Sequence, residues 1–258
     1  MSLSEDRRLR AVQWKDLTHL SLIETIIENT LTLPWLIISS LLAWKHYYLL
    51  ALPFSFIFFL TGLRQVHNGF HYTLGTSRRL TELTLLINSV LMLAAMHAVR
   101  YNHLRHHRYC LQKGDVEGNW ARMPAWKAIL CGPLFIIRQH IAAFRSKDRV
   151  TIGVELLVIV LFVVIVFATH VPFLQYHVLA MLAGEMLTGF FAVWTVHHDC
   201  DEEVFARTLS RRWKNKLTYN MFYHLEHHLF PGVPTIKLPV LAARIREAMP
   251  DMAIKEVF

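Results

Sequence analysis

The stretch TIGVELLVIVLFVVIVFATH, residues 151–170, decides the fold. Its only Asp, Glu, Lys or Arg is Glu155, and its length is about the 20 residues that a helix needs to cross a bilayer. Three other apolar runs, at residues 31–44, 47–63 and 177–196, approach this length with their flanking residues. The pattern predicts four spans, at about residues 28–44, 47–66, 152–170 and 177–196. Because the breaks within each pair are short, we expect two helical hairpins.

The composition agrees with a single integral-membrane domain over residues 1–258. Hydrophobic residues make up 54% of the chain, and the mean hydropathy of +0.33 is high for a soluble protein. The first 20 residues lack the apolar core of a secretory signal. Cys110, Cys131 and Cys200 are too few and too scattered for an iron–sulfur cluster or a disulfide framework.

The positive charges predict the orientation. The formal net charge is +8, and Lys45 is the only one of the 27 Lys and Arg residues at a hairpin tip. By the positive-inside rule, the N-terminal segment, residues 68–150 and residues 197–258 are cytoplasmic. This distribution explains the basic charge without a nucleic-acid partner.

Two segments of the middle region are apolar but are not expected to cross. Residues 82–99 are long enough to span, but a fifth crossing would place the later basic segments outside. We therefore predict a helix that dips into, or lies on, the cytoplasmic leaflet. Residues 125–144 mix charges with apolar side chains and predict an interfacial helix. The predicted fold is an all-α membrane protein, with four membrane helices in two hairpins and a histidine-rich cytoplasmic cap.

Ten of the 16 histidines gather at four places, all on the predicted cytoplasmic side. These places are HNGFH (His67, His71), HLRHH (His103, His106, His107), VHHD (His197, His198) and YHLEHH (His224, His227, His228). Six histidines are scattered: His19, His46, His97, His140, His170 and His177. We interpret His19, His46, His140, His170 and His177 as ordinary hydrogen-bonded side chains.

The spacing of the clustered histidines predicts a metal site. Helix positions i, i+3 and i+4 share a face, so H-x-x-H-H directs its imidazoles toward one region. Imidazole nitrogens bind Zn, Cu, Fe and Ni, and one zinc ion takes about four ligands. The three boxes offer eight imidazoles and the end of the fourth span offers a ninth, which suits two metal ions. The Glu-x-x-His pairs of carboxylate-bridged di-iron bundles and the zinc-protease motif H-E-x-x-H do not occur.

The three boxes resemble those of the membrane fatty acid desaturase and hydroxylase superfamily. HNGFH, HLRHH and HLEHH match its three histidine boxes, and TYNMFYHLEHHLFPGVP (218–234) is similar to the third-box region of bacterial desaturases. The resemblance covers about residues 64–234. It implies a bacterial inner-membrane enzyme with a cytoplasmic non-haem di-iron centre that uses O2 to remove hydrogen from an unactivated C–H bond. By this resemblance the iron ligands are His67, His71, His103, His106, His107, His224, His227 and His228.

A ninth ligand is expected at the end of the fourth span. Acyl-CoA desaturases carry Asn-x-x-x-His there, but the asparagine position holds Val193 before His197 and Trp194 before His198. VHHDC resembles the H-x-x-C stretch of bacterial relatives, which favours His197 over His198.

Several other polar residues have open interpretations. Glu185, about 18 Å before His197 on a helix, would close the far end of a substrate tunnel or be a neutral or paired structural carboxyl. Asp115 and Glu117 would orient ligand histidines or belong to a solvated loop. Asn220 would donate a hydrogen bond behind a metal-ligating histidine or be an ordinary helix-start residue. Glu226, between ligand positions, is expected to point away from the metal.

The sequence therefore predicts a desaturase acting on a fatty acyl chain. The chain has no Rossmann fingerprint, flavin site or haem-binding cytochrome segment, so an external donor is implied, such as a ferredoxin or cytochrome with its reductase. The nearest alternative is a hydroxylase or ketolase of a lipid, alkane or carotenoid with the same iron site. A non-catalytic metal-binding or metal-transporting protein is a third reading, but a transporter should carry ligands within its spans.

Overall fold

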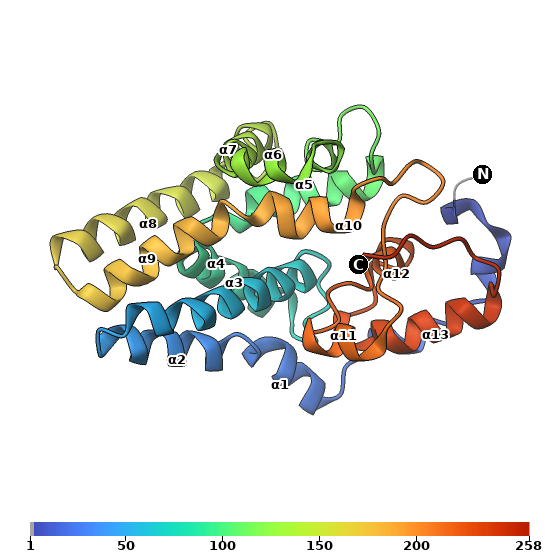
Figure 1. Cartoon of the computed structure of the whole chain (residues 1–258), viewed down its shortest axis with the longest axis horizontal. Coiled ribbons are helices and arrows are strands. Elements are labelled where there is room, and N and C mark those ends of the chain that lie inside the picture. Colours follow the sequence, from blue (N-terminus) through green and yellow to red (C-terminus); the bar gives the residue numbers. More distant parts are fainter. Residues whose placement is uncertain (1–2, 258) are drawn as a thin grey trace.

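The protein is all-helical, as predicted. The structure is a computed structural model that describes residues 3–257. Within these residues no β-strand forms, and a single isolated bridge joins Thr208 to Glu256. Long helices occupy one end of the molecule and short helices gather at the other (Figure 1).

Four helical segments are long and apolar enough to cross a membrane. The first, Leu22–Trp44, consists of α1 (Leu22–Thr30) and α2 (Leu33–Trp44), and the second is α3 (Tyr48–Phe70). The third is α8 (Arg149–Ala168), and the fourth, Pro172–His197, contains α9 (Pro172–Glu185), a π-helix η5 (Gly189–Trp194) and α10 (Thr195–His197). In Figure 1, α2 lies beside α3 and α8 lies beside α9.

The first two segments extend beyond the predicted spans because local contacts satisfy their polar ends. Ser21 and Glu24 form a capping box, which starts α1 well before residue 28. Glu28 is fully buried, and Arg64 of α3 donates to its Oε1 at 2.5 Å. Asn68 donates to the other carboxylate oxygen at 2.8 Å. These contacts hold α1 against the end of α3 that carries the first histidine box.

The predicted continuous helix over residues 82–99 is wrong. The chain forms α4 (Arg78–Met92) and α5 (Met96–Tyr109), which meet at a 110° bend. Leu93, at the bend, has a left-handed φ of 61°. A helix start exposes backbone N–H groups, and three of them are bonded here by side chains. Ala95 N donates to His140 Nε2, Met96 N to Ser89 Oγ and His97 N to Glu155 Oε2.

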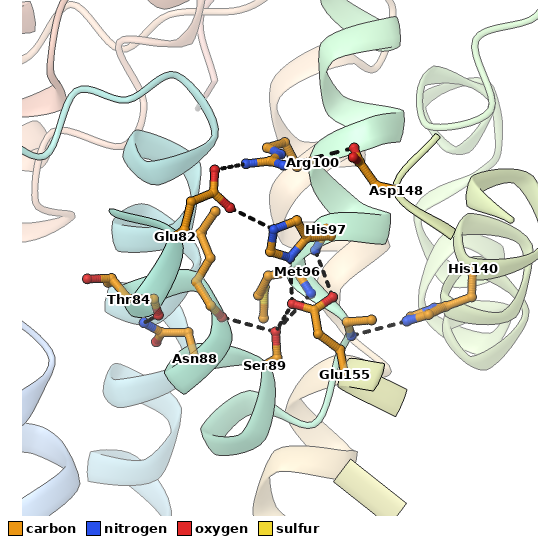
Figure 2. A network of polar contacts seen from close by, with 12 residues as sticks. Glu82, Thr84, Asn88, Ser89, Met96, His97, Arg100, His140, Asp148 and Glu155 are labelled. Atoms are coloured by element: carbon orange, nitrogen blue, oxygen red, sulfur yellow. Dashed lines mark hydrogen bonds and ion pairs between the residues drawn. The ribbon is translucent and has the colours of Figure 1, made fainter. Parts of the chain in front are cut away.

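A buried polar network then fixes the direction of α5 (Figure 2). The His97 ring lies between Glu155 of α8 and Glu82 of α4, at 2.7 Å from each carboxylate. Arg100, one turn further along α5, donates to Glu82 at 2.8 Å. Carboxyl groups inside a membrane protein are costly unless paired, and here the pairing joins three helices. Because α5 carries the second histidine box, this network sets where that box points.

The predicted interfacial helix over residues 125–144 is also divided. It forms α6 (Ala125–Leu130) and α7 (Gly132–Ala143), which are interrupted at Cys131. An ideal Cβ on Gly132 would lie 1.6 Å from the backbone oxygen of Met186, at the end of α9. This close approach of α7 to α9 needs a residue without a side chain.

The C-terminal part packs with the N-terminal segment at the end where the histidine boxes lie. It contains α11 (Arg212–Leu217), α12 (His224–Leu229) and α13 (Leu238–Ala248). Short 3-10 helices lie at Leu3–Glu5, Arg7–Ala11, Lys15–Thr18, Gly118–Arg122 and Thr235–Lys237. Val12 and Leu17 pack with Leu241 and Ile245 of α13 in one apolar cluster, which includes Tyr223 just before α12. Burial of this cluster fixes α12 against the ends of the long helices.

We expect Gly132→Ala to destabilise the protein by at least about 1–3 kcal/mol, because the methyl group must push α7 away from α9. Gly153→Ala on α8 is the matched control, since a Cβ there meets nothing within 4 Å and gains up to about 1 kcal/mol of helix propensity. Thermal unfolding in detergent measures both. If Gly132→Ala melts together with the wild type, the backbones of α7 and α9 are not in contact.

Candidate metal centre

Nine histidines from four places in the chain converge where the helix ends meet. His67 lies in the last turn of α3, and His71 is the residue that ends it. The second box lies on α5, His197 ends α10, and the third box occupies α12. These are the nine histidines that the sequence predicts as ligands: His67, His71, His103, His106, His107, His197, His224, His227 and His228.

The nine imidazoles divide into two groups. The five-histidine group contains His67, His71, His103, His107 and His227, and the four-histidine group contains His106, His197, His224 and His228. Within each group the candidate ligand atoms all lie within 4.8 Å of one another. The structure thus brings together all the predicted histidines, as two adjacent sets.

Each H-x-x-H-H box contributes to both groups. On α5, His103 and His107 face one group while His106, on the adjacent side of the helix, faces the other. On α12, the i and i+4 residues His224 and His228 join the four-histidine group, and His227 joins the other. The division follows from helix geometry, because positions i and i+4 lie above each other and i+3 is displaced around the axis.

The separations between donor atoms fit metal coordination. In the five-histidine group, the Nε2 atom of His103 lies 3.0 Å from that of His71 and 3.1 Å from that of His107. In the other group, His197 Nε2 lies 2.9 Å from His106 Nε2 and 2.8 Å from His224 Nε2. Nitrogens about 3 Å apart are neighbouring ligands of one ion when each bond is about 2.1 Å.

His67 provides a direct test of whether the residues present suit a metal. Its Nε2 is buried and finds no hydrogen-bond partner among residues 3–257. A buried nitrogen without a partner is unfavourable, and it lies among four other donors of the same kind. A cation at the centre of the group would satisfy it.

The protonation of the imidazoles also suits metal binding. Burial, followed by the charges of neighbouring histidines, holds the pKa of His107, His224, His227 and His228 well below the ordinary value. Burial and the charge of His103 do the same for His71. Neutral imidazole is the form that donates a lone pair to a metal.

Acceptors on the far side of three rings fix their orientation. Asp115 accepts from His106 Nδ1 at 2.8 Å, and Glu117 lies 3.3 Å from His103 Nδ1. The backbone oxygen of Phe205 accepts from His197 Nδ1 at 2.7 Å. A proton on Nδ1 leaves the Nε2 lone pair free to face the group. Asp115 and Glu117 are therefore buried orienting residues, one of the two readings that the sequence left open, whereas the Phe205 contact has no signal in the sequence.

The electrostatics of the His106 and Asp115 pair strengthen this orientation. Burial opposes a charge on His106, but the hydrogen bond to Asp115 and the contributions of Cys110 and Glu117 together raise the pKa of the imidazole well above its ordinary value. Asp115 is itself held by the backbone N–H groups of Leu111 and Gly118, both at 2.8 Å. Cys110 lies 4.0 Å from His106 Nε2 and completes a third possible set with Asp115, but this set shares His106 with the four-histidine group.

The structure separates His197 from His198. His198 stacks on Trp194, with ring centroids 3.9 Å apart, and its Nδ1 contacts the Trp194 backbone oxygen at 2.8 Å. It lies in neither group of histidines. Val193, four residues before His197, is fully buried in an apolar cluster.

Two other residues discussed from the sequence also lie outside both groups. Asn220 has a left-handed φ of 62° in the turn before α12, and the residue that caps this helix is Tyr223. Glu226 points away from the histidines as predicted, and its Oε2 accepts from Thr208 at 2.7 Å. Burial raises the pKa of Glu226 to about 7.

Two cavities of about 70 Å³ each lie against the histidines. Both are lined by Leu63, His67, Ala192 and His224, so both adjoin the two groups. One of them shares Phe191, Met221 and Phe222 with an open, apolar groove of about 590 Å³ between α3, η5 and α11. The surroundings of the site are therefore mainly apolar.

The protein-family model for fatty acid desaturases matches residues 43–257 of the chain. The chain belongs to the fatty acid desaturase family. The match includes both histidine groups and three of the four candidate membrane spans in full. No individual curated protein matches the chain significantly.

We expect His197→Ala to lower the iron content of the desaturase family protein from about two ions per chain toward one, because only three imidazoles remain in its group. His198→Ala is the matched control and should keep both ions. Elemental analysis of the purified proteins, together with circular dichroism to verify folding, measures the effect. Full iron content in His197→Ala, or iron loss in His198→Ala, would contradict this assignment.

Proposed function

We propose that the protein is an O2-dependent desaturase that introduces a double bond into a fatty acyl chain. One iron ion would bind in the five-histidine group and a second in the four-histidine group. The observation that carries this proposal is the convergence of nine imidazoles, in two sets, beside apolar cavities. When bound, the iron ions would supply the oxygen activation that amino-acid side chains cannot perform.

The protein contributes position and orientation to this reaction. Asp115, Glu117 and the Phe205 carbonyl hold three imidazoles with Nε2 facing inward. The wall shared by both cavities would place a chain beside His67 and His224. Small misplacements of reacting atoms are costly, so a rigid wall of helix residues favours oxidation at one position.

The apolar groove between α3, η5 and α11 supports a lipid substrate. Its lining includes Ile57, Leu60 and Leu217, and it meets one of the cavities at Phe191, Met221 and Phe222. An alkyl chain leaves water when it enters such a groove, which favours binding by about 0.8 kcal/mol per buried CH2 group. The groove is therefore the proposed entry for the chain.

The balance of the reaction requires a partner. Desaturation takes two hydrogens from the substrate and two electrons and two protons from outside, and it reduces O2 to two water molecules. The two electrons must come from a separate donor, for which we propose a ferredoxin or cytochrome with its reductase. Such a donor, when acidic, would be attracted by the basic surface of this protein.

We propose that the four spans form two hairpins in the bacterial inner membrane, with the termini and the metal centre in the cytoplasm. From Val150 onward the exposed side chains of α8 are apolar, including Leu157, Val160, Leu161 and Val164, as expected of a surface in contact with lipid. Lys45 is exposed between α2 and α3, while the other Lys and Arg residues occur outside both turns. The positive-inside rule then places the histidines on the cytoplasmic side.

Product analysis tests the reaction. We expect cells that express the protein with a suitable electron donor to contain a new lipid that has lost two hydrogens, as measured by mass spectrometry. His227→Ala should abolish this product because it removes a donor of the five-histidine group. A product that gains one oxygen would identify a hydroxylase, which the same set of imidazoles permits. The absence of any new product would contradict an oxidative function.

Cysteine labelling tests the orientation. In a background with Cys110, Cys131 and Cys200 replaced, an impermeant thiol reagent should modify Lys45→Cys in intact cells. It should modify Arg108→Cys, which is exposed beside the second box, only after the membrane is opened. The opposite pattern would place the site on the outer face.

A further inference from the structure

One of the two cavities beside the histidines has polar side chains in its mainly apolar wall. At one side it reaches His67, His103 and His224, and most of its wall is apolar, including Phe70 and Phe135. Gln139 of α7, Glu185 at the end of α9 and the nearby Thr188 also line it. An apolar cavity that also presents a few polar groups is the usual form of a small-molecule site.

The side chains of Gln139 and Glu185 have incomplete sets of hydrogen bonds. Gln139 is 2% exposed, and neither its Nε2 nor its Oε1 finds a hydrogen-bond partner among the described residues. Glu185 is 6% exposed, and its Oε1 is unpaired within residues 3–257, while Oε2 accepts from Thr188 at 3.1 Å. A buried amide and a carboxyl inside a span are unfavourable without partners, so their presence in one cavity indicates a ligand.

We propose that Gln139 and Glu185 bind a hydroxyl group of the substrate, and that the acyl chain oxidised by this enzyme is therefore a hydroxylated one. This inference rests on the proposed desaturase function, because it assigns the substrate of that same site. A hydroxyl group both donates and accepts. It would accept from Gln139 Nε2 and donate to Glu185 Oε1.

A charged ligand group fits the cavity beside Gln139 and Glu185 less well. No Lys or Arg of the described chain lines it, and His140 is already bonded at both ring nitrogens, to the Ile136 oxygen and the Ala95 N–H. An anion would therefore be buried beside Glu185 without a cation. An ammonium group would have no acceptor to offer Gln139 Nε2, which would remain unpaired.

A plain alkyl chain leaves both side chains unpaired. A site built to hydrogen-bond a hydroxyl discriminates strongly against an analogue that lacks it, since the buried polar groups of the site then lose their partner. Gln139 and Glu185 therefore act as specificity-determining residues at a distance from the reacting carbon, rather than as catalytic residues.

Equilibrium binding to the iron-loaded protein in detergent tests the proposal without turnover. The probes are methyl hexadecanoate and a series of methyl monohydroxyhexadecanoates with the hydroxyl at successive carbons. We expect at least one hydroxylated probe to bind the wild type at least about tenfold more tightly than the plain ester. Gln139→Met, which keeps the length of the side chain and removes both polar atoms, should abolish this preference.

Gln65→Met is the matched control. Gln65 is also buried, but its amide is bonded to Glu28, Asn29 and Asn88, and it does not line the cavity. This variant should keep the preference for the hydroxylated probe. Glu185→Gln keeps a polar group of the same size and should retain part of the preference, whereas Glu185→Leu should reduce it further.

The outcomes separate this inference from the proposed function. If no hydroxylated probe binds the wild type more tightly, or if Gln139→Met and Gln65→Met alter the preference equally, the inference is wrong. Desaturation of the plain ester at the same rate as the hydroxylated probes would overturn it while leaving the desaturase function intact. A preference in binding without any oxidised product would support the hydroxyl site and contradict the desaturase function.

Discussion

The backbone N–H groups at the start of α5 lie at a 110° bend inside the helical bundle, and each must find an acceptor. His140, Ser89 and Glu155 supply these acceptors from three different helices. The cost of a buried carboxyl on α8 is offset in turn by its contacts with His97 and Ser89. The direction of α5 depends on this set of bonds, and α5 provides the second histidine box.

The two groups of imidazoles are coupled because α5 and α12 both serve each of them. Movement of either helix would displace donors in the five-histidine and four-histidine groups together. The surrounding contacts oppose such movement, since Asp115 holds α5 through His106 and the Val12, Leu241 and Ile245 cluster holds α12. Catalytic activity should therefore depend on the centre as a unit, so that replacing one imidazole lowers activity nearly as much as replacing two.

The sequence predicted the parts of this structure that follow from periodicity and length. Four apolar segments were sufficient to identify four candidate spans, and the helical spacing of the three boxes identified eight of the nine converging histidines. The choice of His197 over His198 came from the resemblance of VHHDC to the H-x-x-C stretch of bacterial relatives. The break at Leu93 was not predicted, because no strong helix-breaking residue occurs there and tertiary bonds determine it. The break at Cys131 has a local signal in Gly132 and Pro133, which begin α7, and the prediction of one helix over residues 125–144 did not use it. The role of His97 and the unpaired amide of Gln139 depend on which helices meet, and spacing within one helix does not contain that information.

The most direct test of the account is an anomalous-scattering map measured at the iron edge from crystals of the protein purified with its metal. The account predicts two iron peaks, one within the five-histidine group and one within the four-histidine group, with Asp115 and Glu117 outside the coordination shells. A single peak shared by the nine histidines, or an iron held by His198, would contradict it.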